Sequence, residues 1–322
     1  MASPAATTAE HGTSSTPWRP APGRCWSASS PLRRRCLALT AALALAGCTD
    51  LSANAALAPA ALPVYAVGDS YSFDDGRMER VVGTAPSAVR WQGDAGFAFT
   101  TTENVLLPRI EWSDSQVRGA RTMAVARNAL FPLAPGRTVA FQATRRTVEG
   151  TGRSADEVAE SWQCRVDGTE RVATKAGDFD TFRVVCSMRT VPPGPGLTRT
   201  FFYAPAIAYY VRRDDRTGSG TTSTITLTGY TTADPPLTAQ AGQARDAARR
   251  SALETLPSGQ AQPWQDPASG ANGTVRPIST AKSPKYGWCR AYQETVEAST
   301  RLYRSERVAC RTAGGNWQTV SG

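Results

Sequence analysis

Short runs of β-branched and aromatic residues fill the middle of this chain and constrain its fold more than any other feature. From Val64 to Thr231, Gly, Pro and Asp break these runs at close intervals. Branched and aromatic side chains fit a pleated sheet, whereas the interrupting residues suit turns. We therefore predict a mainly β protein, in which residues 64–231 form an antiparallel domain built as a curved sheet or a half-barrel.

The first 47 residues predict export from the cytoplasm. Three arginines, Arg33 to Arg35, precede an apolar run from Cys36 to Ala46, and the run ends in Leu45-Ala46-Gly47-Cys48. A cationic, an apolar and a small-residue segment in this order are typical of a secretory signal, and the apolar run is too short to cross a bilayer. We take residues 1–47 as a leader and signal peptide.

The sequence around Cys48 resembles the lipobox of bacterial lipoproteins, in which the cysteine thiol receives a diacylglycerol and the chain is cut just before it. The resemblance implies that Cys48 is the acylated first residue and that the membrane is a partner through this anchor. An ordinary signal peptide with a chance cysteine is the alternative. Thr49 stands where lipoproteins kept at the inner membrane typically carry Asp, which favours the outer membrane. Residues 48–63, rich in Ala, Leu and Pro, are predicted to be a flexible tether.

Composition narrows the possible functions. The single histidine, His11, lies in the leader, which excludes His-dependent triads and most zinc sites from the mature chain. Cleavage removes five of the 36 basic residues and one of the 27 acidic residues, so the net charge falls from +9 to about +5. The sequence has no run of basic residues interleaved with aromatics of the kind that binds along a nucleic-acid backbone. We expect no nucleic-acid partner, no cofactor and no enzyme activity.

Four cysteines follow Cys48, which is an even number in a chain predicted to enter an oxidising compartment. They are Cys164, Cys186, Cys289 and Cys310. Two disulfides are therefore expected.

The clearest hairpin of the β domain is predicted at Asp167-Gly168, which suits a two-residue turn with positive φ at both positions. This turn would place Arg165 opposite Glu170, a pair worth about 0.2–1 kcal/mol. A second turn at residues 176–178 precedes Phe179-Asp180-Thr181-Phe182. This combination resembles a hairpin in an uncharacterised group of bacterial periplasmic β domains, which implies a curved antiparallel sheet over residues 64–230 and no agreed activity.

These two turns put Cys164 and Cys186 on the outer strands of a three-stranded meander. The outer strands would lie roughly 10 Å apart, whereas a disulfide needs Cα atoms within about 7 Å of each other. We still expect the bond, through a bulge or a bend, because the alternative is two free thiols in an oxidising compartment.

A helix is predicted at residues 235–256, which are rich in Ala, Arg, Gln and Leu and are followed by helix-stopping residues from Pro257 to Gly259. Its apolar face is thin, because three of its five members are alanine: Leu237, Ala241, Ala248, Ala252 and Leu256. We expect this helix to lie on the β domain. Residues 257–286, rich in Pro, Gly, Ser and Asn, are predicted to be a linker.

The last segment, residues 287–322, predicts a small three-stranded β module. Its distinctive residues are Cys289-Arg290, Tyr292-Gln293, Thr295-Val296, Ala309-Cys310-Arg311 and the ending with Gly315, Trp317, Gln318 and Val320. In these residues the segment resembles the C-terminal domain of the rickettsial-type surface antigen lipoproteins. With Ser299-Thr300 as a two-residue turn, Ala298 pairs with Arg301, and nine further steps pair Cys289 with Cys310. The register predicts a disulfide between them.

The sequence Val67-Gly68-Asp69-Ser70-Tyr71-Ser72 resembles the nucleophile block of the GDS-type lipases and esterases, which implies Ser70 as a nucleophile. These enzymes need a histidine from a later block, and none follows. We instead expect a strand that enters a turn, with Asp69 or Asp74 capping backbone amides.

Two further patterns could hold ions. Asp74-Asp75 and Asp214-Asp215 lack the alternating oxygen ligands of a calcium loop, so we predict no metal site. Arg212, Arg213 and Arg216 could bind a phosphate or a lipid head, and the alternative is that they are ordinary exposed arginines at a strand end.

Together these features predict a non-enzymatic, lipid-anchored lipoprotein of the cell envelope with a structural or ligand-presenting role. Its partners besides the membrane would be envelope proteins, lipids or peptidoglycan. The alternative is a periplasmic module that binds a lipid or small molecule on a half-barrel sheet. An apolar cavity lined from opposite strands would favour this alternative, and a filled interior would exclude it. A serine hydrolase using Ser70 is the least favoured function.

Overall fold

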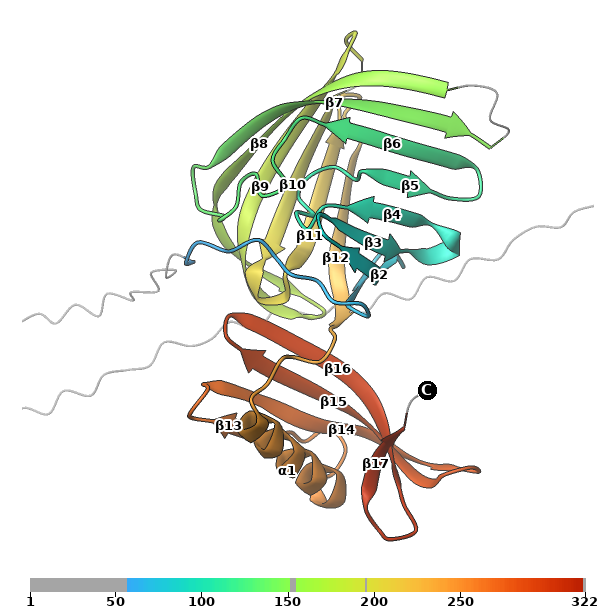
Figure 1. Cartoon of the computed structure of the whole chain (residues 1–322), viewed down its shortest axis with the longest axis vertical. Coiled ribbons are helices and arrows are strands. Elements are labelled where there is room, and N and C mark those ends of the chain that lie inside the picture. Colours follow the sequence, from blue (N-terminus) through green and yellow to red (C-terminus); the bar gives the residue numbers. More distant parts are fainter. Residues whose placement is uncertain (1–56, 151–154, 195, 321–322) are drawn as a thin grey trace, which may run out of the picture. The chain divides into compact units, whose positions relative to one another are not determined.

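The computed structural model describes residues 57–150, 155–194 and 196–320. The leader (1–47), the acylation site predicted at Cys48 and the start of the tether lie outside the described residues. The twelve strands from Ser70 to Thr231 form a closed antiparallel barrel (Figure 1). They are β1 (Ser70–Phe73), β2 (Met78–Ala85), β3 (Ala88–Gln92), β4 (Ala98–Thr101), β5 (Glu111–Ser113), β6 (Val117–Met123), β7 (Thr138–Glu149), β8 (Ala155–Thr174), β9 (Gly177–Val191), β10 (Leu197–Ala204), β11 (Tyr209–Thr217) and β12 (Thr222–Thr231).

The barrel closes because β1 pairs with β12. Ser70 lies opposite Thr231, and Tyr71 lies opposite Tyr230. All the other strand pairs join strands that are consecutive in the sequence. The expected curved sheet or half-barrel is thus corrected to a closed barrel. Closure pairs the backbone N–H and C=O groups that an open sheet would leave free at its two edges.

Strand β8 runs straight through Asp167-Gly168, so the hairpin predicted at this dipeptide is wrong. The register of β8 shifts here instead, and the dipeptide forms a β-bulge. The Asp167 carboxylate lies 2.6 Å from the Arg165 guanidinium and 2.9 Å from that of Arg183. Because the strand continues, Arg165 faces Val185 across β9 and does not face Glu170.

Strands β8 and β9 are joined by a turn at residues 175–176, where Thr174 lies opposite Gly177. This turn is close to the second one predicted from the sequence. With one turn in place of two, Cys164 and Cys186 lie directly opposite each other on adjacent strands, and a disulfide joins them. Their Cα atoms are 4.0 Å apart, so the expected separation across a third strand was wrong.

A helix and a five-stranded antiparallel sheet follow the barrel. They are α1 (Ala239–Thr255), β13 (Gln262–Asp266), β14 (Ala271–Ser283), β15 (Gly287–Ala298), β16 (Arg301–Arg311) and β17 (Trp317–Val320). The linker predicted at residues 257–286 is therefore wrong, because β13 and β14 lie there, whereas the three strands predicted at 287–322 are present as β15 to β17 of this larger sheet. Trp264, Ala271 and Val275 are buried, because alternate residues of β13 and β14 point into a core shared with α1.

Helix α1 packs on this sheet, whereas we expected it to lie on the β domain. Four residues of the helix are buried in the core of the sheet: Ala241, Ala248, Ala252 and Leu253. Alanine side chains are small, so the helix backbone can approach the sheet closely. The Thr238 hydroxyl caps the helix by accepting a hydrogen bond of 3.1 Å from the Ala241 N–H. Within the described residues, no helix is long and apolar enough to cross a bilayer.

The register predicted for the C-terminal hairpin is the register observed. Ala298 lies opposite Arg301, and Cys289 lies opposite Cys310. The structure joins the two cysteines in a disulfide with their Cα atoms 3.9 Å apart. Ser299 takes a φ of 57°, the left-handed conformation that a two-residue turn requires.

The described end of the predicted tether is part of the folded body. Ala60 is buried and forms a β-bridge with Leu133, with hydrogen bonds of 3.0 and 2.8 Å in the two directions. Leu57 and Leu62 pack against the barrel core. A flexible tether through residue 63 is therefore corrected, because the apolar residues of this segment find partners on the barrel.

Candidate binding site inside the barrel

One part of the barrel interior is filled with aromatic side chains. The Tyr71 and Tyr209 rings stack with centroids 4.0 Å apart, and Tyr65 meets Trp91 edge-on at 5.1 Å. The Tyr65 hydroxyl donates a hydrogen bond of 2.6 Å to the Ala208 carbonyl. Burial raises the pKa of Tyr65 and of Tyr71 well above the usual value, so both phenols are neutral in ordinary buffers.

Another part of the interior is a cavity of about 470 Å³. Its wall combines side chains from β2, from β4 to β11 and from the loop between β4 and β5, so it is lined from opposite sides of the barrel. Six arginines line it: Arg77, Arg109, Arg121, Arg145, Arg199 and Arg213. Apolar side chains complete the wall, among them Leu106, Leu107, Trp112, Trp162 and Phe201.

Glu79 on β2 organises one cluster of polar groups in this wall, and its side chain is almost completely buried. The Tyr209 hydroxyl donates a hydrogen bond of 2.5 Å to Oε2, and the Tyr210 hydroxyl donates one of 3.1 Å to the same oxygen. Arg109 Nη2 donates to Oε1 at 3.0 Å. Burial, reinforced by the Glu79 charge, raises the pKa of Tyr210 to about 12. Burial also lowers the pKa of Arg109, although Glu79 opposes this effect.

Glu160 on β8 organises a second cluster and accepts four hydrogen bonds. Arg121 donates two of them, at 2.9 and 3.3 Å, and Arg145 donates one at 3.1 Å. The fourth comes from Trp162 Nε1 at 2.8 Å. Both glutamate oxygens are thus fully used, and one buried carboxylate holds two guanidinium groups in place.

Asp215 on β11 also holds two arginines. Arg199 binds it with two parallel hydrogen bonds of 2.7 and 2.8 Å, and Arg213 Nε lies 3.3 Å from Oδ2. Burial alone would raise the pKa of Asp215, but the hydrogen bond and charge of Arg199, with the charge of Arg213, lower it overall. The carboxylate is therefore ionised at neutral pH.

These three clusters leave the cavity wall positively charged. Five arginines converge on Glu79, Glu160 and Asp215, which are three carboxylates. Asp156, the further partner of Arg145 at 3.9 Å, is largely exposed to water, and Arg77 pairs with Asp75 at a half-exposed position. Two guanidinium charges consequently have no buried carboxylate of their own among the described residues.

The arginines predicted as an anion site are divided by strand alternation. Arg213 lines the cavity, whereas Arg212 pairs with Asp214 at 2.9 Å and Arg216 is exposed. Sequence reasoning missed Arg109, Arg121, Arg145 and Arg199. Residues two positions apart in a strand point to the same face, so a charged residue at this spacing from an inward-facing apolar residue could have identified them. Examples are Arg199 before Phe201 and Arg145 after Ala143.

Ser70 lies outside the cavity wall. Its hydroxyl shares a hydrogen bond of 2.6 Å with the Thr231 hydroxyl. The neighbouring Asp69 carboxylate accepts hydrogen bonds from the Ala66 and Ala233 N–H groups at 3.1 and 2.9 Å, and from Arg301 at 2.8 Å. Asp69 thus caps backbone amides, as expected, and the structure places no general base on Ser70 within the described residues.

The aspartate pairs have structural partners. Asp74 Oδ1 accepts a hydrogen bond of 2.9 Å from the Thr226 N–H, and Asp75 pairs with Arg77 at 3.1 Å. Asp214 and Asp215 each pair with arginine. Among the described residues, no group of three or more His, Cys, Asp or Glu side chains could hold a metal ion.

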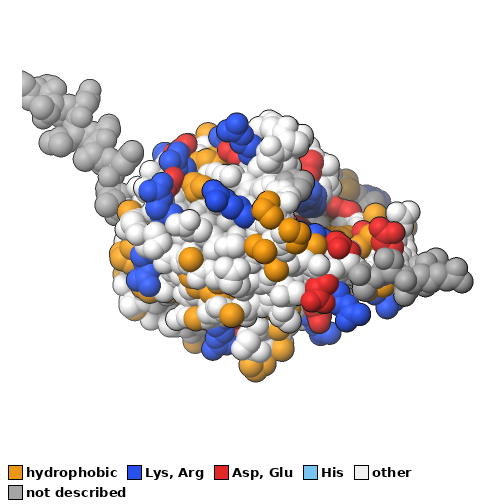
Figure 2. Space-filling view, turned by 90° about the horizontal axis from the view of Figure 1, so that it is seen from above, with side chains coloured by type: hydrophobic (Ala, Val, Ile, Leu, Met, Phe, Trp, Pro, Cys, Tyr) orange, Lys and Arg blue, Asp and Glu red, His pale blue; other side chains and the backbone are white. Residues whose placement is uncertain are grey.

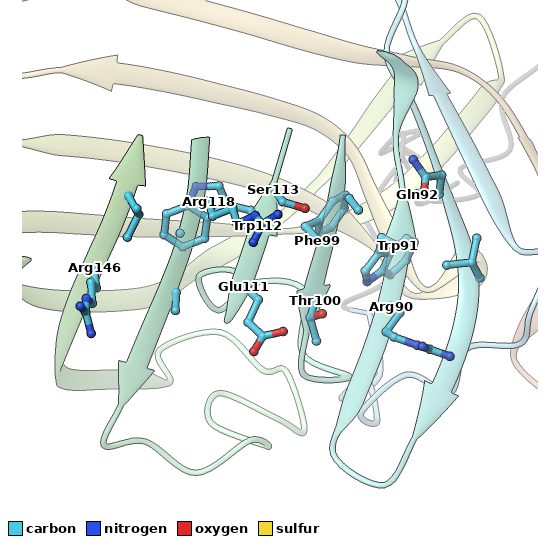
Figure 3. A pocket seen from close by; sticks show the side chains of 15 residues that line it. Arg90, Trp91, Gln92, Phe99, Thr100, Glu111, Trp112, Ser113, Arg118 and Arg146 are labelled. Atoms are coloured by element: carbon cyan, nitrogen blue, oxygen red, sulfur yellow. The ribbon is translucent and has the colours of Figure 1, made fainter. Parts of the chain in front are cut away.

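A second hollow, of about 640 Å³, lies over β2 to β7 (Figure 3). Arg90, Thr100, Glu111 and Arg146 extend toward the same side of the strands in this view. Trp91, Phe99 and Trp112 line this hollow together with them, and Phe99 and Trp112 also line the interior cavity. On the face of the molecule that Figure 2 shows, Lys and Arg side chains are interspersed with acidic and apolar ones.

Comparisons with known proteins identify the C-terminal part of the chain. Residues 251–318 match the family model described as 17 kDa outer membrane surface antigen. The match begins inside α1, so this domain includes β13 and β14 as well as the hairpin recognised from the sequence. No curated protein matches the chain.

The chain is similar to several solved structures at low identity. The hypothetical lipoprotein YmcC from Escherichia coli is 13% identical with a TM-score of 0.38, over 53% of this chain and 86% of that one. An exported protein with a YmcC-like fold from Bacteroides fragilis is 16% identical with a TM-score of 0.35, over 53% and 99%. A lipoprotein from Parabacteroides distasonis is 12% identical with a TM-score of 0.29, over 54% and 100%. The match to the surface-antigen family model covers one domain of the chain, residues 251–318.

Proposed function

We propose that this protein is a lipid-anchored component of the bacterial cell envelope whose barrel binds a small organic ligand in its interior cavity. The observation that carries the binding function is the cavity of about 470 Å³ lined from opposite strands. Its volume lies within the range of ordinary small-molecule sites, about 300–1,000 Å³. The sequence alone favoured a structural or ligand-presenting role. The cavity supports ligand binding in the barrel as the leading function instead.

The envelope location rests on two independent features. One is the leader that ends in Leu45-Ala46-Gly47-Cys48, which resembles a lipobox. The other is the domain at residues 251–318, whose family is described as an outer membrane surface antigen. Two disulfides are in keeping with an oxidising compartment. In this proposal Cys48 carries the lipid, and the outer membrane is the site of attachment.

We propose binding without catalysis. The mature chain has no histidine, and Ser70 is hydrogen-bonded to Thr231 outside the cavity wall. The charged groups inside the cavity hold one another in place, which suits recognition of a ligand more than transfer of a proton.

Metabolic labelling with a radioactive fatty acid tests the anchor. The parent protein should be labelled, and Cys48→Ser should not. Label retained by Cys48→Ser would contradict the anchor and leave the binding proposal standing.

Mass spectrometry of small molecules that co-purify with the full chain tests the binding function. Thr190→Trp would fill the cavity, because Thr190 lines it, whereas Ser187→Trp is a matched control at an exposed position on the same strand. We expect a compound that is present with the parent and Ser187→Trp but lost with Thr190→Trp. Equal recovery from both variants would refute binding in the cavity.

A further inference from the structure

The cavity contains hydrogen-bond donors that the protein itself does not use. Arg109 donates through Nη2 to Glu79, and none of its other N–H groups donates to a described residue. Arg199 binds Asp215 through Nε and Nη2, which leaves Nη1 without a described acceptor. Arg213 Nη1 makes only a long bond of 3.4 Å to the Tyr210 hydroxyl. Arginine cannot lose its proton, so these donors are permanently cationic.

Arg213 is the most enclosed of the three. Its side chain is 11% exposed, and its Nε, which lies 3.3 Å from Asp215 Oδ2, makes no well-aligned hydrogen bond to a described residue. A buried, unsatisfied donor on a cation costs free energy unless another acceptor reaches it. Arg199 and Arg213 pair with the same carboxylate, Asp215, so their unused N–H groups belong to neighbouring side chains.

The position of Arg109 is fixed by packing as well as by charge. Its guanidinium lies 4.0 Å from the centroid of the Phe99 ring and 4.9 Å from that of Phe97. These contacts and the bond to Glu79 hold the group at the wall before any ligand arrives. A preorganised guanidinium loses little entropy when it binds an anion.

We propose that the ligand carries a phosphate or carboxylate group, which binds among Arg109, Arg199 and Arg213. This inference rests on the proposed binding function and names the chemical class of the ligand. Five guanidinium groups of the wall share three carboxylates, and an anion would use the free donors and offset the excess positive charge. The rest of the ligand would lie against apolar side chains of the same cavity, such as Leu107, Trp162 and Phe201.

Three probes with the same six-carbon tail and different heads test the inference. Hexyl phosphate, 1-hexanol and hexylamine are titrated into the full-length protein in phosphatidylcholine nanodiscs, and inorganic phosphate is titrated separately. Trp112 and Trp162 line the cavity, so tryptophan fluorescence reports binding, and calorimetry gives the dissociation constants. We expect hexyl phosphate to bind about tenfold or more tightly than hexanol, and hexylamine to bind most weakly. Tighter binding of hexyl phosphate than of inorganic phosphate would identify an ester with an apolar tail, and equal binding would identify the free anion.

Neighbouring arginines provide the matched variants. Arg213→Gln should weaken hexyl phosphate binding by about tenfold to a hundredfold and should affect hexanol binding much less, because hexanol carries no anionic head. Arg212→Gln should change neither, because Arg212 pairs with Asp214 and does not line the cavity. Since the comparison of heads needs only the parent protein, it decides the question even if Arg213→Gln does not fold.

The outcomes separate this inference from the proposed function. If hexanol binds in the cavity as tightly as hexyl phosphate, the anionic class is wrong and the binding function stands. If Arg212→Gln weakens hexyl phosphate as much as Arg213→Gln does, the three-arginine site is wrong. If no probe gives a saturable signal, the binding proposal fails together with the inference.

Discussion

Cys164 lies directly opposite Cys186 across β8 and β9, with both side chains fully buried and the Cα atoms 4.0 Å apart. The disulfide closes a loop of the chain with a sequence separation of 22. It lies in the wall of the barrel, and Cys164 is on β8, the strand that also carries Glu160 and Trp162. Its contribution to stability should therefore be measurable on the barrel itself.

Replacing both Cys164 and Cys186 with alanine should lower the free energy of unfolding of the barrel by about 3 kcal/mol, because the unfolded chain regains the entropy that the cross-link removes. Denaturant unfolding followed by tryptophan fluorescence measures the change. The matched control is the double alanine variant of Cys289 and Cys310, which has a similar separation of 21 but lies in the C-terminal sheet. If the unfolding midpoint of the barrel falls equally in both double variants, the Cys164–Cys186 disulfide does not stabilise the barrel specifically.

The fold was predictable from the sequence where a local pattern determines it. Alternation and turn residues placed the β domain at 64–231, and the observed strands run from Ser70 to Thr231. The pairing of Cys289 with Cys310 followed from one turn and a count of residues. Closure was not predictable, because the pairing of β1 with β12 joins the two ends of the domain and leaves no local signal.

Two of the predictions made from the sequence were wrong for the same physical reason. Asp167-Gly168 suits a two-residue turn and a bulge equally well, and only the continued pairing with β9 selects the bulge. The Gly, Pro and Ser content of residues 257–286 suggested a linker, yet Trp264 and Val275 are buried under α1. In both places tertiary contacts override the local preference.

Of the residues in the proposed binding site, only Arg213 was predicted from the sequence. Clustering in the sequence drew attention to Arg212, Arg213 and Arg216, but neighbours in a strand point to opposite faces. The arginines that share the cavity with Arg213 come from other strands and from loops, and the fold of the barrel brings them together. A charged residue in an inward-facing series, such as Glu160 before Trp162, was the available clue.

Glu160→Gln should destabilise the protein strongly. The substitution removes the buried charge that holds Arg121 and Arg145 at the cavity wall, and breaking a buried ion pair typically costs about 3–5 kcal/mol. Glu157→Gln is the control on the same strand, because Glu157 is exposed and should change stability by less than about 0.5 kcal/mol. Chemical denaturation of both variants gives the comparison. Equal stability of the two would show that Glu160 does not hold the arginines.

Stability should fall between about pH 10 and pH 12. Burial and the Glu79 charge raise the pKa of Tyr210 to about 12, and burial raises the pKa of Tyr230 to about 12. The unfolded chain ionises these phenols near pH 10, so above this pH it loses protons that the folded chain retains. The stabilisation is complete below pH 10 and is lost as the pH rises to 12, by about 3 kcal/mol per tyrosine at most. Melting temperature and tyrosinate absorbance against pH test this, and a flat melting temperature up to pH 12 would contradict it.

Gly119→Ala should disturb the cavity wall, because Trp112 lies directly over Gly119. An added Cβ would meet the Trp112 ring at 1.9 Å, so the indole would have to leave its place between the two strands. Overpacking of this kind typically costs about 1–3 kcal/mol. The displaced indole should also shift the tryptophan emission and weaken ligand binding, because Trp112 lines the cavity. Gly229→Ala is the control in the same barrel, since its Cβ would meet no atom within 4 Å. If both variants keep the parent emission and stability, the position of Trp112 in this wall is wrong.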